Sequence, residues 1–208
     1  MSLLETAPMR KMFLALAGLA LIASPALAGP GKFNKVVSPG DKAPVFSGIP
    51  AINGEQETSL SLSDIKEDVV VLVFMNNECP YVVAVEDRLV DFVNDYKGKS
   101  VKLIGVSVVA NDKLSKIKEH HKTSSKFVYG LDETQAIGKA YGASNTPQFF
   151  VLDKSRTIRY TGAMDDSPMK EDAVKKSYVR NAVDALLSGK DVEVSETRAI
   201  GCGVGYKK

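Results

Sequence analysis

The stretch VVVLVFMNNECPYV (residues 69–82) decides the fold, because a buried strand passes into a helix within it. Its first half is a continuous apolar run rich in β-branched residues, which predicts a central strand buried on both faces. Pro80 suits the first helical position, where its missing amide hydrogen would lack a partner in any case. Cys79 therefore lies at the junction of strand and helix, and the role of its thiol is the question that the sequence raises.

The segments around this stretch predict an α/β fold. Apolar residues at three- and four-residue spacing predict an amphipathic helix from about Pro80 to Tyr96, ended by Gly98. Further patterns predict a strand over 101–109, a polar helix around 112–122, a helix over 131–143, strands over 148–153 and 156–161, and a helix over 171–188. This order predicts a central mixed β-sheet flanked by helices. Upstream, Asn53-Gly54 predicts the turn of an N-terminal β-hairpin extension.

The N-terminus has the pattern of a secretory signal peptide. Two basic residues, Arg10 and Lys11, precede an apolar run over 12–23, and small residues lead to a cleavage site expected after Ala28. The apolar run is shorter than the ~20 residues of a membrane-spanning helix, which makes an uncleaved membrane anchor the less favoured alternative. We therefore expect removal of residues 1–28 and export of the mature protein, best matched by a bacterial periplasm.

The rest of the chain divides into a flexible leader (29–37), one domain (38–194) and a C-terminal tail (195–208). A net charge of +2 and a hydrophobic content of 44% fit a soluble globular protein and do not indicate a nucleic-acid partner. The chain's two cysteines, Cys79 in the domain and Cys202 in the tail, both remain after cleavage. One disulfide across a long loop is therefore feasible in an exported chain.

The position of Cys79 favours a reactive thiol. The positive end of the helix dipole and nearby free amides stabilise a thiolate over a thiol. Glu78 would oppose that effect by like-charge repulsion if its side chain pointed inward. The alternative is a buried, inert cysteine at the end of a strand.

Four further motifs accompany the opening stretch in a characteristic order: GDKAPVFSG (40–48), NGEQETSLSLSDIK (53–66), DETQAIGKAYGASNTPQFFVLD (132–153) and IRYTGAMDD (158–166). Together they resemble the thioredoxin-like redoxins, and specifically the peroxiredoxin-like (AhpC/TSA-related) proteins, over nearly all of residues 38–208. The resemblance implies a thioredoxin-like fold and redox chemistry on sulfur. It is more specific for the fold than for the reaction.

The resemblance places Cys79 on the first cysteine of the thioredoxin motif, but the motif here is C-P-Y-V. Val82 stands where the resolving cysteine would be, so release of a mixed disulfide needs another thiol. Peroxiredoxins proper use P-x-x-x-[TS]-x-x-C, and those two positions hold Leu72 and Asn76. Asn76 can hydrogen-bond but lacks the hydroxyl that the motif requires, which argues against efficient peroxidase chemistry.

The resemblance also implies a substrate-binding loop at Thr146-Pro147. In the family this proline is usually cis, packs beside the active cysteine, and follows backbone groups that hydrogen-bond a bound peptide. A cis X-Pro bond occurs in roughly 5% of cases in folded proteins, so a cis bond here is a sharp prediction. The expected substrate-binding residues are Asn76, Pro80, Tyr81, Thr146 and Pro147.

Cys202 is the remaining candidate for a resolving cysteine. Glycines 201, 203 and 205 predict a mobile tail that reaches Cys79 within the chain or across a homodimer. Two alternatives stay open: a static disulfide that pins the tail, or an idle Cys202. No cofactor is expected. The adjacent His120 and His121 face different directions on a helix, so a shared metal is not expected either.

Three functions therefore follow from the sequence. The first is an exported thiol-disulfide oxidoreductase that acts on a protein or small-molecule disulfide and is served by an external thiol reductant. The second is a thiol-dependent peroxidase that reduces a hydroperoxide. The third is a non-enzymatic binding module in which Cys79 and Cys202 form a structural disulfide.

Overall fold

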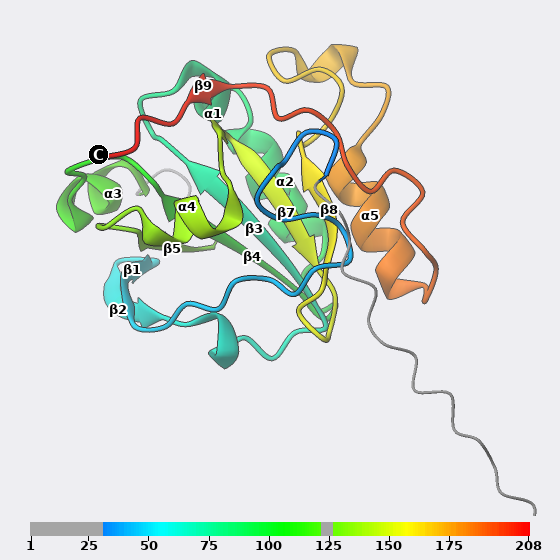
Figure 1. Ribbon diagram of the computed structural model, residues 1–208, viewed down its shortest axis with the longest axis horizontal. Helices are drawn as coiled ribbons and strands as arrows, with labels where there is room; N and C mark the ends of the chain where they lie inside the picture. Colours follow the sequence, from blue (N-terminus) through cyan, green and yellow to red (C-terminus); the bar gives the residue numbers. More distant parts are fainter. Residues whose placement is uncertain (1–30, 122–126) are drawn as a thin grey trace, which may run out of the picture.

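A computed structural model of the 208-residue chain describes residues 31–121 and 127–208 (Figure 1). The predicted signal peptide, residues 1–28, lies outside the described residues. None of the helices in the described ranges has the length and apolarity to cross a bilayer.

A seven-stranded mixed sheet forms the centre of the molecule, in the order β2-β1-β5-β4-β3-β7-β8. Strands β3, β4 and β5 are parallel, and β1, β2, β7 and β8 add antiparallel pairs at the two edges. The strands are β1 (Ile49–Asn53), β2 (Gln56–Leu60), β3 (Val69–Met75), β4 (Val101–Ser107), β5 (Val128–Leu131), β7 (Gln148–Leu152) and β8 (Ile158–Gly162). This confirms the predicted α/β fold with a mixed sheet.

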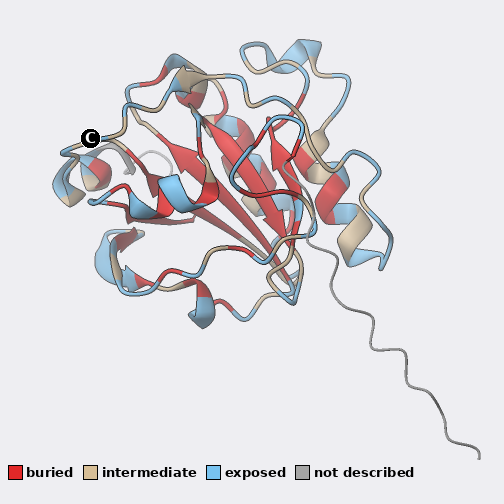
Figure 2. Ribbon diagram, viewed as in Figure 1, coloured by how far each residue is buried: buried red, intermediate tan, exposed pale blue. Residues whose placement is uncertain are grey.

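Strand β3 is an interior strand of the sheet, between β4 and β7, and both of its faces are buried. Alternate side chains enter two separate hydrophobic clusters, with Val71 and Val73 on one face and Leu72 and Phe74 on the other. Side chains of a strand point alternately to opposite faces, so a strand covered on both sides must be apolar throughout. The continuous apolar run in the sequence has this cause, and Figure 2 shows the central strands in the colour of buried residues.

Helices cover both faces of the sheet (Figure 1). Side chains of α2 and α5 belong to the hydrophobic cluster on one face, and side chains of α4 belong to the cluster on the other. The helices are α1 (Pro80–Val83), α2 (Glu86–Asp95), α3 (Leu114–His121), α4 (Ala136–Tyr141) and α5 (Tyr178–Leu187), with 3-10 turns at Leu62–Asp64 and Glu171–Ala173. The arrangement leaves the C-terminal ends of β3 and β4 at one edge of the domain.

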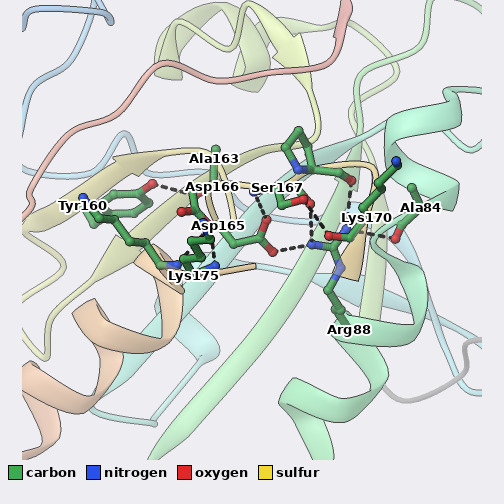
Figure 3. Close-up of polar contacts among 11 residues, drawn as sticks. Ala84, Arg88, Tyr160, Ala163, Asp165, Asp166, Ser167, Lys170 and Lys175 are labelled. Atoms are coloured by element: carbon green, nitrogen blue, oxygen red, sulfur yellow. Dashed lines mark hydrogen bonds and ion pairs between the residues drawn. The ribbon is translucent and has the colours of Figure 1, made fainter. Parts of the chain in front are cut away.

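The prediction of one helix from Pro80 to Tyr96 is wrong, because the helix is interrupted between α1 and α2. At the interruption the Ala84 carbonyl accepts a hydrogen bond from Arg88 Nη2 at 3.0 Å. Arg88 is buried, and its guanidinium also pairs with the Asp165 carboxylate and donates to the carbonyls of Ser167 and Pro168 (Figure 3). A side chain from α2 thus joins the end of α1 to the loop between β8 and α5.

That loop also accounts for a second correction. The predicted helix over 171–188 begins only at Tyr178, and the residues before it form a 3-10 turn and an extended segment. Asp166 accepts the amide hydrogens of Lys175 and Lys176 at 2.8 and 3.0 Å, which fixes the loop's return to α5 (Figure 3). In this part of the predicted helix, the backbone amides therefore donate to the Asp166 side chain and not to carbonyls of a helix.

The N-terminal part of the described chain contains the predicted hairpin and a segment that packs against the domain. Strands β1 and β2 pair with Asn53 opposite Gln56, and Gly54 in the two-residue turn has a φ of +60°, which suits glycine. This hairpin is joined to the main sheet through β5. Residues 31–37, within the predicted flexible leader, make hydrogen bonds to the domain, including Asn34 Nδ2 to the Tyr141 carbonyl at 2.8 Å.

Candidate functional site

Cys79 lies directly before α1, at the end of the short loop that follows β3. Its amide hydrogen is donated to the Asn76 carbonyl at 2.9 Å, and Asn76 Oδ1 accepts the Glu78 amide at 3.0 Å. Pro80 takes the first helical position, as the sequence predicts. Asn76 therefore shapes the turn that presents Cys79, and its amide oxygen is engaged within that turn.

The electrostatic setting of Cys79 differs from the expectation in two ways. Glu78 points to solvent, where its carboxylate lies 3.8 Å from Lys116 Nζ, so the repulsion expected from an inward Glu78 is absent from this arrangement. The helix that begins at Pro80 has a single turn and does not continue to Tyr96, which reduces the dipole available to a thiolate. Local amides rather than a long helix must supply the stabilisation of a charged sulfur.

The Thr146-Pro147 bond is cis, which confirms the prediction for this loop. Both residues are buried, and Thr146 forms the short strand β6 (Asn145–Thr146). The Thr146 carbonyl oxygen lies 3.1 Å from Cys79 Sγ. The structure thus brings together two segments that the resemblance pairs, although they lie 67 residues apart.

Cys79 and Cys202 form a disulfide, with their Cα atoms 6.1 Å apart and a sequence separation of 123. Cys79 is only 1% exposed, whereas Cys202 is partly exposed. Val82 is fully buried in the hydrophobic cluster that also contains Cys79, so it acts as a core residue at the position of a second motif cysteine. The pairing that the sequence left open is therefore present in this structure.

The tail around Cys202 lies against the site, and its glycines take part in that packing. Strand β9 (Cys202–Gly203) pairs antiparallel with β6, placing Cys202 opposite Thr146 and Gly203 opposite Asn145. Asn145 Nδ2 donates to the Gly201 carbonyl at 2.9 Å. A Cβ on Gly201 would overlap the Thr146 carbonyl, so this glycine allows close approach of two backbones.

Contacts beyond Cys202 hold the end of the tail on α4. Gln135, fully buried in the loop before α4, donates to the Gly205 carbonyl at 2.9 Å and accepts the Lys207 amide at 2.8 Å. Tyr206 donates its hydroxyl to the Ala143 carbonyl at 2.6 Å. Figure 1 shows the tail in red, passing α1 at β9 and ending near α3 and α4.

Contacts before Cys202 hold the start of the tail on β8 and on the N-terminal segment. Thr197 Oγ1 accepts the Ala163 amide at 3.0 Å and shares a hydrogen bond with the Tyr160 hydroxyl at 2.7 Å. The Glu196 carboxylate accepts three consecutive amides, from residues 32–34, at 2.7 to 2.8 Å. These anchoring residues were missed in the sequence, because isolated polar side chains carry no signal of such distant partners.

A polar hollow of about 490 Å³ lies next to the loop before Cys79. Its lining includes Asn76, Asn77 and Glu78 from that loop and Asp112 from the loop after β4. The buried Tyr129 hydroxyl donates to Asn77 Oδ1 at 2.7 Å, and burial raises the pKa of Tyr129 well above its ordinary value. Tyr129 therefore remains a neutral hydrogen-bond donor that fixes Asn77 at the edge of the hollow.

The remaining predicted binding residues flank the sulfur pair on the α1 side. Pro80 is exposed, and Tyr81 is partly buried against the cluster that contains Cys79. These residues and the edge of β6 lie next to the disulfide. Its buried sulfur belongs to Cys79 at the strand-helix junction, and its more exposed sulfur belongs to Cys202 on the tail. Such an arrangement can exchange sulfur bonds if the tail moves away from β6.

Comparison with known proteins gives a family match and several structural likenesses. A family model described as the AhpC/TSA family matches residues 39–161. No curated protein matches the chain. An uncharacterized conserved protein from Geobacillus kaustophilus has 31% sequence identity and a TM-score of 0.74, over 83% of this chain and 93% of that one.

Two other solved structures are similar. A hypothetical protein from Sinorhizobium meliloti has 28% identity and a TM-score of 0.74, covering 84% of this chain and 97% of its own. The thioredoxin domain of a thiol-disulfide oxidoreductase from Bacteroides vulgatus has 23% identity and a TM-score of 0.51, covering 59% of this chain and 86% of that domain. This last likeness shows a shared thioredoxin-like fold.

Proposed function

Because this chain belongs to the AhpC/TSA family, we propose that it is a thiol-disulfide oxidoreductase whose redox couple is Cys79 and Cys202. The observation that carries the proposal is the disulfide between a cysteine at the strand-helix junction and a cysteine on the tail. Since Val82 cannot resolve a mixed disulfide, Cys202 supplies the second sulfur that thioredoxin-type exchange needs.

In the reducing direction, the Cys79 thiolate attacks one sulfur of a substrate disulfide. A Cys79-substrate disulfide forms, and the other substrate sulfur leaves as a thiolate and takes up a proton. The Cys202 thiolate then attacks Cys79 Sγ, the remaining substrate sulfur leaves, and the Cys79–Cys202 bond forms. The substrate gains two electrons and two protons, and the protein becomes oxidised.

An external thiol reductant returns the protein to its dithiol form. Cys202 is the accessible sulfur of the pair because Cys79 is 1% exposed beneath the tail. The reductant's thiolate therefore attacks Cys202, and Cys79 leaves as a thiolate. A second thiolate from the reductant then releases Cys202. Departure from the more buried position is easier when local amides stabilise the leaving thiolate.

The compartment is part of the proposal. Residues 1–28 act as a signal peptide, and the mature protein works in an oxidising compartment such as a bacterial periplasm. Disulfides persist in such compartments and are rare where thiols are kept reduced. The tail disulfide fits that setting.

The decisive experiment uses the mature protein, its Cys79→Ser variant and its Cys202→Ser variant with oxidised glutathione as the substrate. We expect turnover with wild type in the presence of dithiothreitol, none with Cys79→Ser, and a trapped Cys79-glutathione disulfide in Cys202→Ser by mass spectrometry. A disulfide that resists mild reductant, with no trapped adduct, would contradict the proposal and favour the structural role.

A parallel arm tests peroxidase activity with hydrogen peroxide. In that reaction the Cys79 thiolate would take one peroxide oxygen to form a sulfenic acid, water would leave, and Cys202 would condense with the sulfenic acid to release a second water. Asn76 lacks the hydroxyl of peroxiredoxins, and its side-chain oxygen is engaged by the Glu78 amide. We therefore expect slower turnover with peroxide than with a disulfide.

A further inference from the structure

The tail binds the domain as a separate peptide strand would. Its strand β9 is antiparallel to β6, and main-chain pairing of this kind sets the path of a bound segment largely without regard to its side chains. After Cys202 in the sequence, the Val204 amide donates to the Ser144 carbonyl at 3.0 Å. Before Cys202, the Gly201 carbonyl accepts a hydrogen bond from Asn145 Nδ2. The path of the tail is therefore a template for other segments that bring a sulfur to Cys79.

The two glycines that flank Cys202 differ in the space around them. A Cβ on Gly201 would overlap the Thr146 carbonyl and lie 3.1 Å from the Pro147 nitrogen, while a Cβ on Gly203 would meet no described atom within 4 Å. Neither glycine has a positive φ, so the difference is one of space and not of backbone conformation. The position before the bonded cysteine has room for glycine but not for a side chain, whereas the position after it has room for a side chain.

We propose that residues 200–204 are an intramolecular mimic of the substrate, and that the exchange partner is an extended polypeptide whose reactive cysteine directly follows a glycine. This inference rests on the proposed function of Cys79. A partner with a side chain at the preceding position would have to displace the Thr146-Pro147 backbone, which is buried and backed by the core. Overpacking of that kind is destabilising, and we expect it to lower the exchange rate by about tenfold or more.

The same geometry makes the tail a competitor of its own substrate. Cys202 and a partner cysteine would both bond to Cys79 Sγ. Both segments would also pair with the same edge of β6 and pass equally close to the Thr146 carbonyl. Because the tail is part of the chain, it competes at a high effective concentration. A partner therefore gains access when Cys202 is reduced and the tail leaves β6.

The test uses peptide AIGCGVG, which has the sequence of residues 199–205, with its cysteine carried as a disulfide with thionitrobenzoate. The protein is the full mature chain with Cys202→Ser. The Cys79 thiolate attacks the peptide sulfur, the Cys79-peptide disulfide forms, and coloured thionitrobenzoate leaves. Each rate is divided by the rate of the same peptide with free dithiothreitol, which removes differences in intrinsic reactivity.

Two peptide variants test whether the site requires glycine before the reactive cysteine. We expect Gly201→Ala in the peptide to lower the normalised rate by about tenfold or more, and Gly203→Ala to change it by less than about twofold. The tail of the protein slows all three peptides alike, so the ratios do not depend on it.

Equal rates for the three peptides, or a larger loss with Gly203→Ala, would overturn the inference and leave the proposed function intact. Failure of Cys79 to react with any of the peptides, judged by mass spectrometry of the protein, would instead overturn the proposed function. A reduced Cys202→Ser protein that keeps its near-ultraviolet circular dichroism shows that the domain remains folded in the assay.

Discussion

The two sulfurs of the site are positioned in opposite ways. Cys79 follows the central strand β3 within a short loop, so its place is set by neighbouring residues and by the core beneath it. Cys202 lies on a tail that packs over the surface and is held by separate contacts along its length. One sulfur is positioned by the core of the domain, and the other by strand pairing and hydrogen bonds at the surface. The two positions therefore depend on different interactions.

The strongest way to break this comparison is to damage the core around β3, the strand that leads to Cys79. Phe74 on β3 is fully buried and contacts the rings of Tyr141 and Phe150. We expect Phe74→Ala to lower the free energy of unfolding by about 3–5 kcal/mol in urea titrations of the reduced protein.

The control for that experiment is removal of residues 200–208 in the same reduced state. We expect the shortened chain to lose clearly less stability than Phe74→Ala, since this part of the tail has no fully buried residue. An equal or larger loss on truncation would show that the tail is an integral part of the core.

A second prediction concerns how tightly the tail is held beside Cys79. Gly201→Ala places a methyl group against the Thr146 carbonyl, so the tail should lose its pairing with β6. We expect the effective concentration of Cys202 at Cys79, measured by equilibrium with a glutathione redox buffer, to fall by about tenfold. Gly203→Ala is the matched control, and a similar fall in both variants would contradict the close-approach role of Gly201.

A third prediction concerns a contact that holds the tail far from the two sulfurs. Glu196→Gln removes the charge that accepts the amides of residues 32–34, and we expect a loss of about 1 kcal/mol in unfolding free energy. Partial burial raises the pKa of Glu196, but hydrogen bonds from the amides of Asn34, Phe33 and Lys32 outweigh it, and the pKa lies below its ordinary value of 4.5.

The sign of the pH effect follows from that lowered pKa. The stabilisation from Glu196 is fully present above pH 4.5 and is lost as the pH falls through the lower pKa of the folded state. Urea titrations of wild type and Glu196→Gln at several pH values should therefore converge on acidification. A difference that stays constant down to the lowest pH would contradict this assignment.

The smallest expected effect is at the exposed pair Glu78–Lys116. Both side chains are mostly in solvent, and such pairs contribute about 0–1 kcal/mol. We expect Lys116→Ala to leave the normalised exchange rate of Cys79 within about twofold, measured with the thionitrobenzoate peptide. A larger change would mean that Glu78 turns toward the sulfur when its partner is removed.

Much of the structure that positions Cys79 can be predicted from the sequence, because it depends on residues close to one another in the chain. The apolar run of β3, the Asn53-Gly54 turn and the position of Pro80 each depend on nearby residues. The cis bond before Pro147 is different, since it follows from the resemblance to redoxins and not from local pattern.

The elements that escape prediction depend on distant contacts. Strand β5 is only four residues long, includes Gly130, and is completed by its neighbours β4 and β1. The interruption between α1 and α2 involves Arg88, whose partners on the loop after β8 lie about 80 positions away. The path of the tail depends on Gln135 and Glu196, and the periodicity of a sequence does not encode such pairings.

The disulfide also has a topological consequence. The bond joins positions 123 residues apart, so in the oxidised chain β4 to β8 lie inside a covalent ring, while β1, β2 and β3 lie outside it. In the chain-entropy view, closing a loop on the order of 100 residues restricts the denatured ensemble by about 4–5 kcal/mol. Each oxidation closes this ring and each reduction opens it. The oxidised protein should therefore resist unfolding more strongly than the reduced protein.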